Sequence, residues 1–309
     1  GRELSMPQII EKAETRKKVV IVGSGPAGME AARVAGERGH EVVVYEAAPN
    51  PGGQIRLTAQ NERRREMISI IEWRMAECTR LGVSFHFNTW AEADTITAEN
   101  PDVVIIATGG MPDTEVLSKG NDLVVSTWDI ISGDVKPGTN VLVYDDAGDH
   151  AGLQAAELIA KSGAKVEIMT PDRSFAPEVM AMNLVPYMRS MQKLDTTFTV
   201  TYRLEAVEKQ GNQLIAHVGS DYGGVAKQRV VDQIVVNHGT IPLDDIYFDL
   251  KPGSSNHGEM SHNDLLDGKP QSVVRNPDGT YQLFRIGDAV SARNTHAAIY
   301  DALRLLKDV

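Results

Sequence analysis

The chain has 309 residues, of which 42% are hydrophobic and 24% charged, and its formal net charge is −11. This length and composition fit a globular protein with room for two domains. The negative charge argues against a surface for nucleic acids or anionic membranes, and the single cysteine, Cys78, excludes a disulfide framework, a CxxC redox pair and an all-cysteine metal site within this chain.

The start of the chain carries only a weak pattern. Residues 1–16 are polar and predict a linker, or a docking helix, that leads into the first strand. No apolar run approaches the length of a membrane span, and we recognise no signal peptide. These features favour a cytoplasmic protein with no membrane partner.

Residues 18–46 predict a strand, a glycine turn, a helix and a second strand. The apolar run 19–22 leads into Gly23-Ser24-Gly25-Pro26-Ala27-Gly28, and a second apolar run follows at 42–45. A Gly-x-Gly-x-x-Gly turn in this context is typical of a dinucleotide-binding fold. We therefore expect a diphosphate to lie at this turn.

Each glycine of the turn has a separate expected task. Gly23 makes the tight turn, Gly25 lets a pyrophosphate approach the backbone, and Gly28 lets the helix pack closely on the sheet. The helix begins with Pro26 and Ala27, and its N-terminus presents N–H groups and a partial positive charge to the phosphates.

Two segments after this helix extend the expected site. Glu46 ends the second strand, where a carboxylate can accept hydrogen bonds from an adenosine ribose. Residues 51–54, Pro-Gly-Gly-Gln, predict a turn in which Gly53 and Gln54 pass close to whatever the first turn binds.

The next elements complete the first fold. Apolar residues at three and four spacings predict an amphipathic helix over 62–81, and 81–89 predicts a strand. A short buried strand at 103–107 ends in Thr108-Gly109-Gly110. In a doubly wound sheet, the carboxyl end of such a strand opens onto the ligand crevice.

Near residue 112 the pattern begins again. Residues 141–144, 153–161 and 164–169 predict strand, helix and strand, and Gly152 corresponds to Gly28 of the first unit. The chain therefore contains a second dinucleotide fold inserted after the first.

The second turn has lost the glycine pattern. It carries Asp145, Asp146 and Asp149 where a pyrophosphate would lie, and Thr170 stands in place of the ribose-binding acid. Negative charges a few ångströms apart repel a phosphate, so we expect no working NAD(P)H site here.

The later segments are more loosely patterned. Residues 198–237 alternate and predict a β-meander, which is followed by His238, interpreted as a loop histidine. Residues 249–280 are rich in Gly, Ser, Asn, Asp and Pro and predict a long surface loop without metal ligands. The end of the chain predicts a strand at 281–286, then Gly287 and Asp288, whose carboxylate can accept a polyol hydroxyl, and a helix over 295–306.

Together these elements predict an α/β protein with two Rossmann-like dinucleotide-binding domains, the second inserted into the first. The expected division is a linker at 1–16, a discontinuous FAD- or ADP-binding domain at 17–112 and 243–309, and an inserted NAD(P)-like domain with a degenerate fingerprint at 113–242. The cofactor-binding residues expected in this chain are Gly23, Gly25, Pro26, Ala27, Gly28, Glu46, Gly53, Gln54, Thr108, Gly109, Gly287 and Asp288.

These motifs, in this order, resemble the flavoprotein disulfide reductase group with two dinucleotide folds. The lack of CxxC and the acidic second turn differ from its thioredoxin-reductase-like members. The chain most resembles the C-terminal half of the trimethylamine dehydrogenase and 2,4-dienoyl-CoA reductase group, and within it demethylases of dimethylglycine or stachydrine. The run at 293–301 and the linker-like start carry this closer resemblance.

The resemblance implies a larger oxidoreductase that oxidatively demethylates N-methylated amines or amino acids. Such enzymes carry FMN and a 4Fe-4S cluster on an N-terminal Old-Yellow-Enzyme-type barrel, which is absent from these 309 residues. The chain would hold FAD or only ADP, supply no catalytic residue and no metal ligand, and be inactive alone. Asp301, where the resemblance implies a glycine beside the flavin, weakens the case for complete FAD.

Two alternatives stay open at this point. The chain could be a self-sufficient NAD(P)H:FAD reductase that passes electrons to a partner, as in 2,4-dienoyl-CoA reductase. It could also be a non-catalytic scaffold, stabilised by its nucleotide, that docks an electron-transfer flavoprotein. The resemblance also implies a homo-oligomer for the full-length enzyme.

Overall fold

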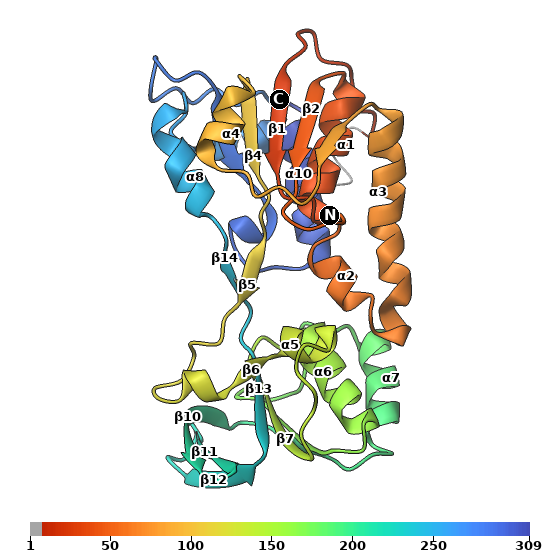
Figure 1. Ribbon diagram of the computed structural model, residues 1–309, viewed down its shortest axis with the longest axis vertical. Helices are drawn as coiled ribbons and strands as arrows, with labels where there is room; N and C mark the ends of the chain where they lie inside the picture. Colours follow the sequence, from red (N-terminus) through yellow and green to blue (C-terminus); the bar gives the residue numbers. More distant parts are fainter. Residues whose placement is uncertain (1–7) are drawn as a thin grey trace. The chain divides into compact units, whose positions relative to one another are not determined.

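The computed structural model describes residues 8–309, which divide into two compact units (Figure 1). Unit 1 contains the described residues up to Ala59, together with Arg63–Met111 and Thr240–Val309, and unit 2 contains Gln60–Glu62 and Pro112–Gly239. Residues 1–7, the first part of the expected linker, lie outside the described residues. Residues 8–16 form no helix, and their backbone reaches the end of the first helix, where the Ala13 N–H donates to the Arg38 carbonyl over 2.9 Å.

Unit 1 is built on a parallel sheet of five strands with helices on both faces. In spatial order the strands are β15 (Gln282–Arg285), β4 (Val103–Ile106), β1 (Lys18–Val22), β2 (Glu41–Tyr45) and β3 (Ser84–His86). The longer helices are α1 (Pro26–Arg38), α3 (Ser69–Arg80) and α10 (Thr295–Leu306). The shorter ones are α2 (Gln54–Thr58), α4 (Ala93–Ala98), α8 (Asp245–Leu250) and α9 (His262–Asp267), with 3₁₀ turns at Glu62–Ile68, Lys251–Gly253 and Gly287–Ala289.

The apolar run of β1 is continuous because both faces of the sheet are covered. Val19 and Ile21 pack under α1 and α10, whereas Val20 and Val22 face the side of Tyr247 and Leu250. Segments from opposite ends of the chain, α1 and α10, thus share one hydrophobic core (Figure 1). β1 lies between β4 and β2, so the strand order changes direction at β1.

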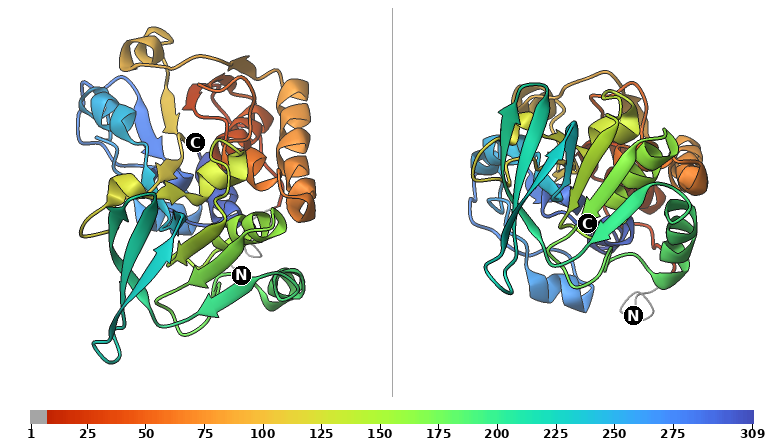
Figure 2. Two further views of the ribbon diagram at one scale, coloured as in Figure 1. Left: turned by 60° about the horizontal axis from the view of Figure 1, so that its bottom comes forward. Right: turned by 90° about the horizontal axis from the view of Figure 1, so that it is seen from below.

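Unit 2 repeats this plan with an added antiparallel sheet. Its parallel strands are β6 (Val125–Ser126), β13 (Gln233–Asn237), β7 (Asn140–Asp145), β8 (Lys165–Met169) and β9 (Thr196–Thr199). Its helices are α5 (Thr127–Ser132), α6 (His150–Lys161) and α7 (Ala181–Met191), with a 3₁₀ turn at Asn121–Leu123. The antiparallel strands β10 (Arg203–Gln210), β11 (Gln213–Gly219) and β12 (Ala226–Val231) pack beside the parallel sheet (Figure 2).

Short strands β5 (Gly110–Pro112) and β14 (Thr240–Pro242) pair with each other.

The predicted α/β fold with parallel sheets is confirmed, and three local predictions need correction. The meander covers only 203–231, because 196–199 and 233–237 pair with the parallel sheet instead. The helix expected over 62–81 is a 3₁₀ turn up to Ile68 and an α-helix only from Ser69. The expected loop 249–280 contains helix α9, whose N-cap Ser261 accepts the Asp264 N–H.

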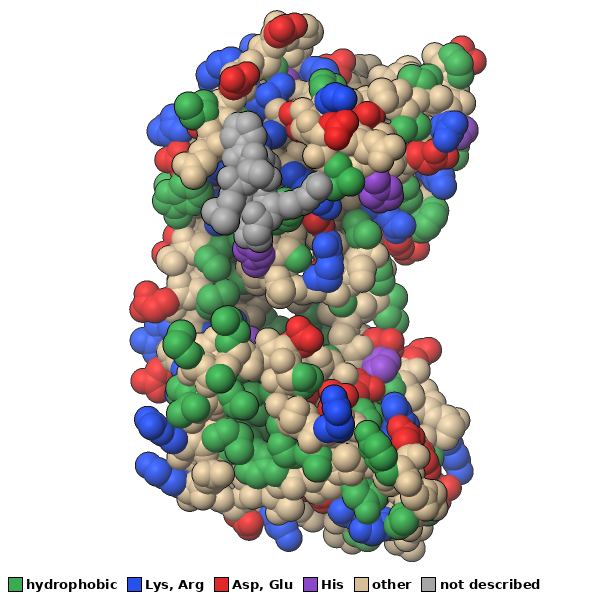
Figure 3. Space-filling model, turned by 180° about the vertical axis from the view of Figure 1, so that it is seen from behind, with side chains coloured by type: hydrophobic (Ala, Val, Ile, Leu, Met, Phe, Trp, Pro, Cys, Tyr) green, Lys and Arg blue, Asp and Glu red, His purple; other side chains and the backbone are tan. Residues whose placement is uncertain are grey.

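The surface of the described residues shows mixed character. On the face seen in Figure 3, positive and negative side chains are interspersed, and hydrophobic side chains gather on unit 2, at the bottom. Within residues 8–309, every helix is too short or too polar to cross a bilayer. The same residues bring together no group of three His, Cys, Asp or Glu side chains that could bind a metal ion.

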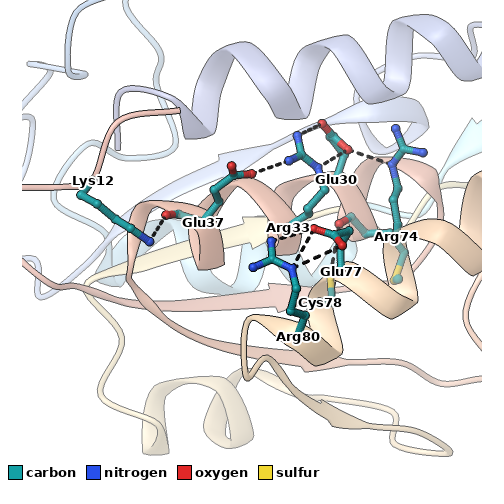
Figure 4. Close-up of polar contacts among 9 residues, drawn as sticks. Lys12, Glu30, Arg33, Glu37, Arg74, Glu77, Cys78 and Arg80 are labelled. Carbon is teal, nitrogen blue, oxygen red and sulfur yellow. Dashed lines mark hydrogen bonds and ion pairs between the residues drawn. The ribbon is translucent and has the colours of Figure 1, made fainter. Parts of the chain in front are cut away.

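A buried ion-pair network fixes α1 to α3. The Glu30 carboxylate of α1 is 2.7 Å from Arg33 Nη2 and 2.8 Å from Arg74 Nε of α3, and the three side chains are only 4%, 11% and 12% exposed. Figure 4 shows both guanidinium groups directed at this carboxylate. Beside it, Cys78 is buried and donates to the Met29 carbonyl, and burial raises its pKa to about 12. The thiol therefore packs as a small neutral group.

Glu30→Gln should lower the free energy of unfolding by about 3 kcal/mol, because Arg74 would be left buried without its counter-charge. Urea unfolding of the variant and the unaltered chain measures this difference. Glu77→Gln is the matched control, since Glu77 of α3 pairs with the largely exposed Arg80, and its effect should be much smaller. Equal effects of the two substitutions would contradict a structural role for the buried network.

Candidate functional site

The residues expected to bind a cofactor gather at one edge of the unit 1 sheet. The strands are parallel, and Val22, Tyr45, Ile106 and Arg285 end β1, β2, β4 and β15 at matching register positions. Four of the segments with expected cofactor-binding residues follow these strands. The fifth, the turn at 51–54, is hydrogen-bonded to the glycine turn. The edge thus carries the glycine turn 23–28, Glu46, Thr108-Gly109 and Gly287-Asp288.

Two glycines of the first turn, Gly23 and Gly28, have no room for a side chain, whereas Gly25 does. Gly23 has φ +98°, and a Cβ there would lie 2.4 Å from the Ala107 carbonyl oxygen at the end of β4. A Cβ on Gly28 would lie 1.9 Å from the Gly23 carbonyl oxygen. A Cβ on Gly25, in contrast, would meet no atom within 4 Å. The open position is the one at which the sequence predicts the approach of a pyrophosphate.

The N-terminus of α1 is free to bind an anion. Its N-cap is Gly25, with no side-chain capping bond, Pro26 opens the helix, and its first turn contains no acidic residue. The first N–H groups of an α-helix have no partner within the helix and carry a partial positive charge. Together with the open space at Gly25, this arrangement fits a diphosphate.

Glu46 is held by three hydrogen bonds from the chain itself. Its Oε2 accepts the Ser24 N–H at 2.7 Å and the Ser24 hydroxyl at 2.6 Å, and its Oε1 accepts the Ala48 N–H at 2.8 Å. The side chain is only partly buried. Ser24 stands at a position of the Gly-x-Gly-x-x-Gly motif that any residue can fill, so the motif alone assigns it no role. Its polar side chain between two glycines was the available signal.

The second glycine turn is attached to the first. The Gly52 N–H donates to the Ser24 carbonyl at 2.9 Å, and a Cβ on Gly53 would lie 3.4 Å from the Gly25 Cα. The two turns therefore line the same space. Gly53 is also the N-cap of α2, which places Gln54 in the first turn of that helix.

Gln54 and Asp288 meet across this edge. Gln54 Nε2 donates to Asp288 Oδ2 at 3.0 Å, and the Arg293 N–H donates to Asp288 Oδ1 at 3.2 Å. Burial raises the pKa of Asp288, and these two donors oppose the rise. Gly287 packs against α1, since a Cβ there would lie 2.9 Å from the Ala27 Cβ.

Thr108 and Gly109 make contacts within the protein. The Thr108 hydroxyl donates to the Leu243 carbonyl, and the Gly109 carbonyl accepts the Leu243 N–H at 3.0 Å. These bonds join the segment leaving β4 to the segment returning after β14. Asp301, expected beside a flavin, is ion-paired with Arg293 and lies 3.5 Å from Arg304.

The corresponding turn of unit 2 contains a buried carboxyl group. Asp145, at the end of β7, is buried, and its Oδ1 accepts the Gly148 N–H at 2.9 Å and Asn237 Nδ2 at 2.8 Å. A Cβ on Gly152 would lie 2.3 Å from Asp145 Oδ2. Burial, followed by the nearby charge of Asp149, raises the pKa of Asp145 to about 7.

The N-terminus of α6 is also occupied. Asp149 is its N-cap and accepts the Ala151 N–H at 2.8 Å, and it accepts Asn237 Nδ2 at 2.9 Å. Asp146 Oδ1 lies 2.5 Å from His238 Nδ1, so His238 is a loop residue paired with an acid. In unit 2, the side chains of Asp145 and Asp149 thus occupy the turn and the helix N-terminus. In unit 1, the N-terminus of α1 has no capping side chain.

Comparison with known proteins identifies relatives over nearly the whole chain. A family model described as pyridine nucleotide-disulphide oxidoreductase matches residues 17–301. A probable N-methylproline demethylase of Rhizobium meliloti (strain 1021) is 77% identical over 309 residues, which are 100% of this chain and 46% of that protein. An N,N-dimethylglycine/sarcosine dehydrogenase of Chromohalobacter salexigens is 42% identical over 317 residues, covering 99% of this chain and 46% of that protein.

A solved structure of 2-naphthoyl-CoA reductase has 27% identity and a TM-score of 0.78, covering 97% of this chain and 41% of that one. The 77% and 42% identities to the Rhizobium meliloti and Chromohalobacter salexigens proteins confirm the resemblance to demethylases of N-methylated amino acids. The chain spans about half the length of the curated relatives it matches.

The free energy of unfolding of unit 2 should depend on pH through the ionisation of Asp145. Its folded-state pKa of about 7 lies above the ordinary aspartate pKa of 3.8, so folding favours the protonated form. As pH rises from 4 to 7, the unfolded chain ionises first and the Asp145 contribution to the free energy of unfolding falls. Asp145→Asn cannot ionise, so its stability relative to the unaltered chain should increase across this range and level off above pH 7.

Hydrogen exchange of the β7 amides, corrected for the pH dependence of intrinsic exchange, measures this difference. A difference that stays constant between pH 4 and 7 would contradict a buried, proton-binding Asp145.

Proposed function

Because the chain belongs to the pyridine nucleotide-disulphide oxidoreductase family, we propose that it is the nucleotide-binding module of a larger oxidoreductase, with ADP or the ADP part of FAD held in unit 1. Family membership implies FAD or NAD(P) binding. Gly23, Gly25 and Gly28 would receive the diphosphate at the start of α1, and Glu46 the adenosine ribose. Gly53, Gln54, Thr108 and Asp288 would line the extension towards a flavin.

The contrast between the two helix N-termini carries this proposal. In unit 1, α1 begins without a capping side chain and a Cβ on Gly25 would meet open space. In unit 2, Asp149 caps α6 and Asp145 packs against Gly152. A phosphate at the second turn would have to displace these carboxylates or lie beside their charge, which is unfavourable in a partly dry site. Unit 2 is therefore proposed to bind no pyridine dinucleotide.

The proposed substrates of the whole enzyme are N-methylated amino acids, which would be oxidatively demethylated. This is supported by the identity to the Rhizobium meliloti and Chromohalobacter salexigens relatives over essentially this entire chain. The proposed catalytic part lies outside these 309 residues, in an Old-Yellow-Enzyme-type barrel of the same polypeptide that carries FMN and a 4Fe-4S cluster. We assign no catalytic residue to this chain and expect it to be inactive alone.

The proposed electron acceptor is an electron-transfer flavoprotein, and the full-length enzyme is proposed to be a cytoplasmic homo-oligomer. An acceptor outside the chain fits a unit 2 without a working nicotinamide site. A chain that used NAD(P)H to reduce its own flavin would need that site.

The nucleotide itself provides the first test. The purified 309-residue chain is denatured, and the released compound is identified by mass and by its visible spectrum. We expect ADP or FAD in a ratio of about one per chain, and no change in any flavin spectrum when NADH or NADPH is added. Release of no adenine nucleotide, together with no binding of added ADP, would overturn the proposal. NADPH-dependent bleaching would instead support a self-sufficient reductase.

Gly25→Asp should abolish nucleotide retention without unfolding the chain. Gly25 has φ −68° and open space around its Cβ position, so the aspartate is sterically tolerated but places a negative charge where the diphosphate would lie. Asp146→Asn in unit 2 is the matched control and should leave retention unchanged. Circular dichroism verifies folding, and calorimetric titration with ADP measures binding. Equal loss in both variants would overturn the division of roles between the two units.

A further inference from the structure

We infer that Ser24 is a positioning residue for ribose recognition: its buried hydroxyl holds the Glu46 carboxylate in the orientation that accepts the adenosine ribose. The inference rests on the proposed function, because it requires an adenosine nucleotide in unit 1. It assigns a task to the one polar side chain inside the glycine turn.

Ser24 joins three segments of the site. Its N–H and its hydroxyl both donate to Glu46 Oε2, at 2.7 and 2.6 Å, and its carbonyl accepts the Gly52 N–H at 2.9 Å. The glycine turn, the acid that follows β2 and the second glycine turn therefore meet at a single residue. Ser24 is 0% exposed, so its hydroxyl acts on Glu46 rather than on a ligand.

The bonds to Glu46 leave part of its carboxylate free. An ionised carboxylate offers about four lone-pair sites, and Ser24 and Ala48 use three of them. The side chain is partly exposed, so the remaining capacity is accessible to a ligand. A ribose hydroxyl would meet an acceptor whose orientation is already set.

Orientation matters because a glutamate has several rotatable bonds. An unrestrained side chain loses rotamer freedom when it binds a ligand, and that loss weakens binding. The Ser24 hydroxyl, together with the Ser24 and Ala48 N–H groups, reduces this freedom in the Glu46 side chain before a nucleotide binds. Its contribution should therefore appear only with ligands that contact Glu46 through the ribose.

The backbone of Glu46 is fixed independently of Ser24. Its N–H donates to the His86 carbonyl at 2.9 Å, and its carbonyl accepts the Thr89 N–H at 2.9 Å. Removal of the Ser24 hydroxyl therefore takes away one of the three hydrogen bonds that orient the carboxylate, without moving the main chain. The Ser24 N–H still donates to Oε2, so the change tests the hydroxyl alone.

The test compares ADP with 2′,3′-dideoxy-ADP on the 309-residue chain, freed of any co-purified nucleotide. Ser24→Ala should weaken ADP binding by up to about tenfold, because the Glu46 side chain would then lose more rotamer freedom on binding, and should change dideoxy-ADP binding less than about twofold. In a Glu46→Gln background, the same substitution should have little further effect on ADP. Calorimetric titration, with competition for the weaker ligand, gives the dissociation constants.

Ser254→Ala is the matched control. Ser254 is also 0% exposed in unit 1, its hydroxyl donates to the Lys251 carbonyl at 2.8 Å, and it has no bond to Glu46. This variant should leave the binding of both nucleotides unchanged.

Three results would overturn the inference. Equal weakening of ADP and dideoxy-ADP by Ser24→Ala would show that the hydroxyl serves only the fold of the turn. Unchanged ADP affinity would show that the Ser24 hydroxyl contributes to ADP binding neither through Glu46 nor through the fold of the turn. If the unaltered chain bound no ADP, the proposed function would fail first, and this inference with it.

Discussion

An α-helix N-terminus at the edge of a parallel sheet requires acceptors for its first N–H groups, and the two units meet this requirement differently. In unit 1, α1 begins at Gly25 without a capping side chain, and the space in front of it is open. In unit 2, Asp149 caps α6, while Asp145 accepts the Gly148 N–H and packs against Gly152. The same backbone plan can therefore accept an external anion in one unit and carries internal anions in the other.

Hydrogen bonds within the chain connect the segments of the proposed site in unit 1. Ser24 ties Glu46 and Gly52 to the glycine turn, and Gln54 contacts Asp288 across the same edge. Behind the turn, the Glu30 carboxylate holds α1 against α3 through Arg74 and also pairs with Arg33 of its own helix. Burying this charge network is costly unless every partner is present. The direction of the helix that faces the proposed diphosphate thus depends on side chains remote from it.

The chain combines an open glycine turn in unit 1 with a cysteine that packs in the core. Its one thiol is buried with a raised pKa, and no metal-ligand group is found within residues 8–309. The relatives that match it are about twice as long. The open position at Gly25 and this difference in length support the proposal of a module that holds a nucleotide, with substrate oxidation proposed for the remainder of a longer polypeptide.

The elements of each Rossmann-like unit could be predicted from sequence because their signals are local. The apolar run of β1, the glycine turn and the helical spacing of 295–306 each reflect neighbours a few residues apart, and the structure confirms β1, α1 and α10. Only the tertiary structure decided which strands pair: 196–199 and 233–237 lie at the two ends of the segment predicted as a meander, yet both join a parallel sheet. Tertiary structure also brought Asn237 to Asp145, 92 residues away, and the Ser24 hydroxyl to Glu46. Hydrogen bonds of this kind depend on the register of strands distant in sequence, which the spacing of residues along the chain does not encode.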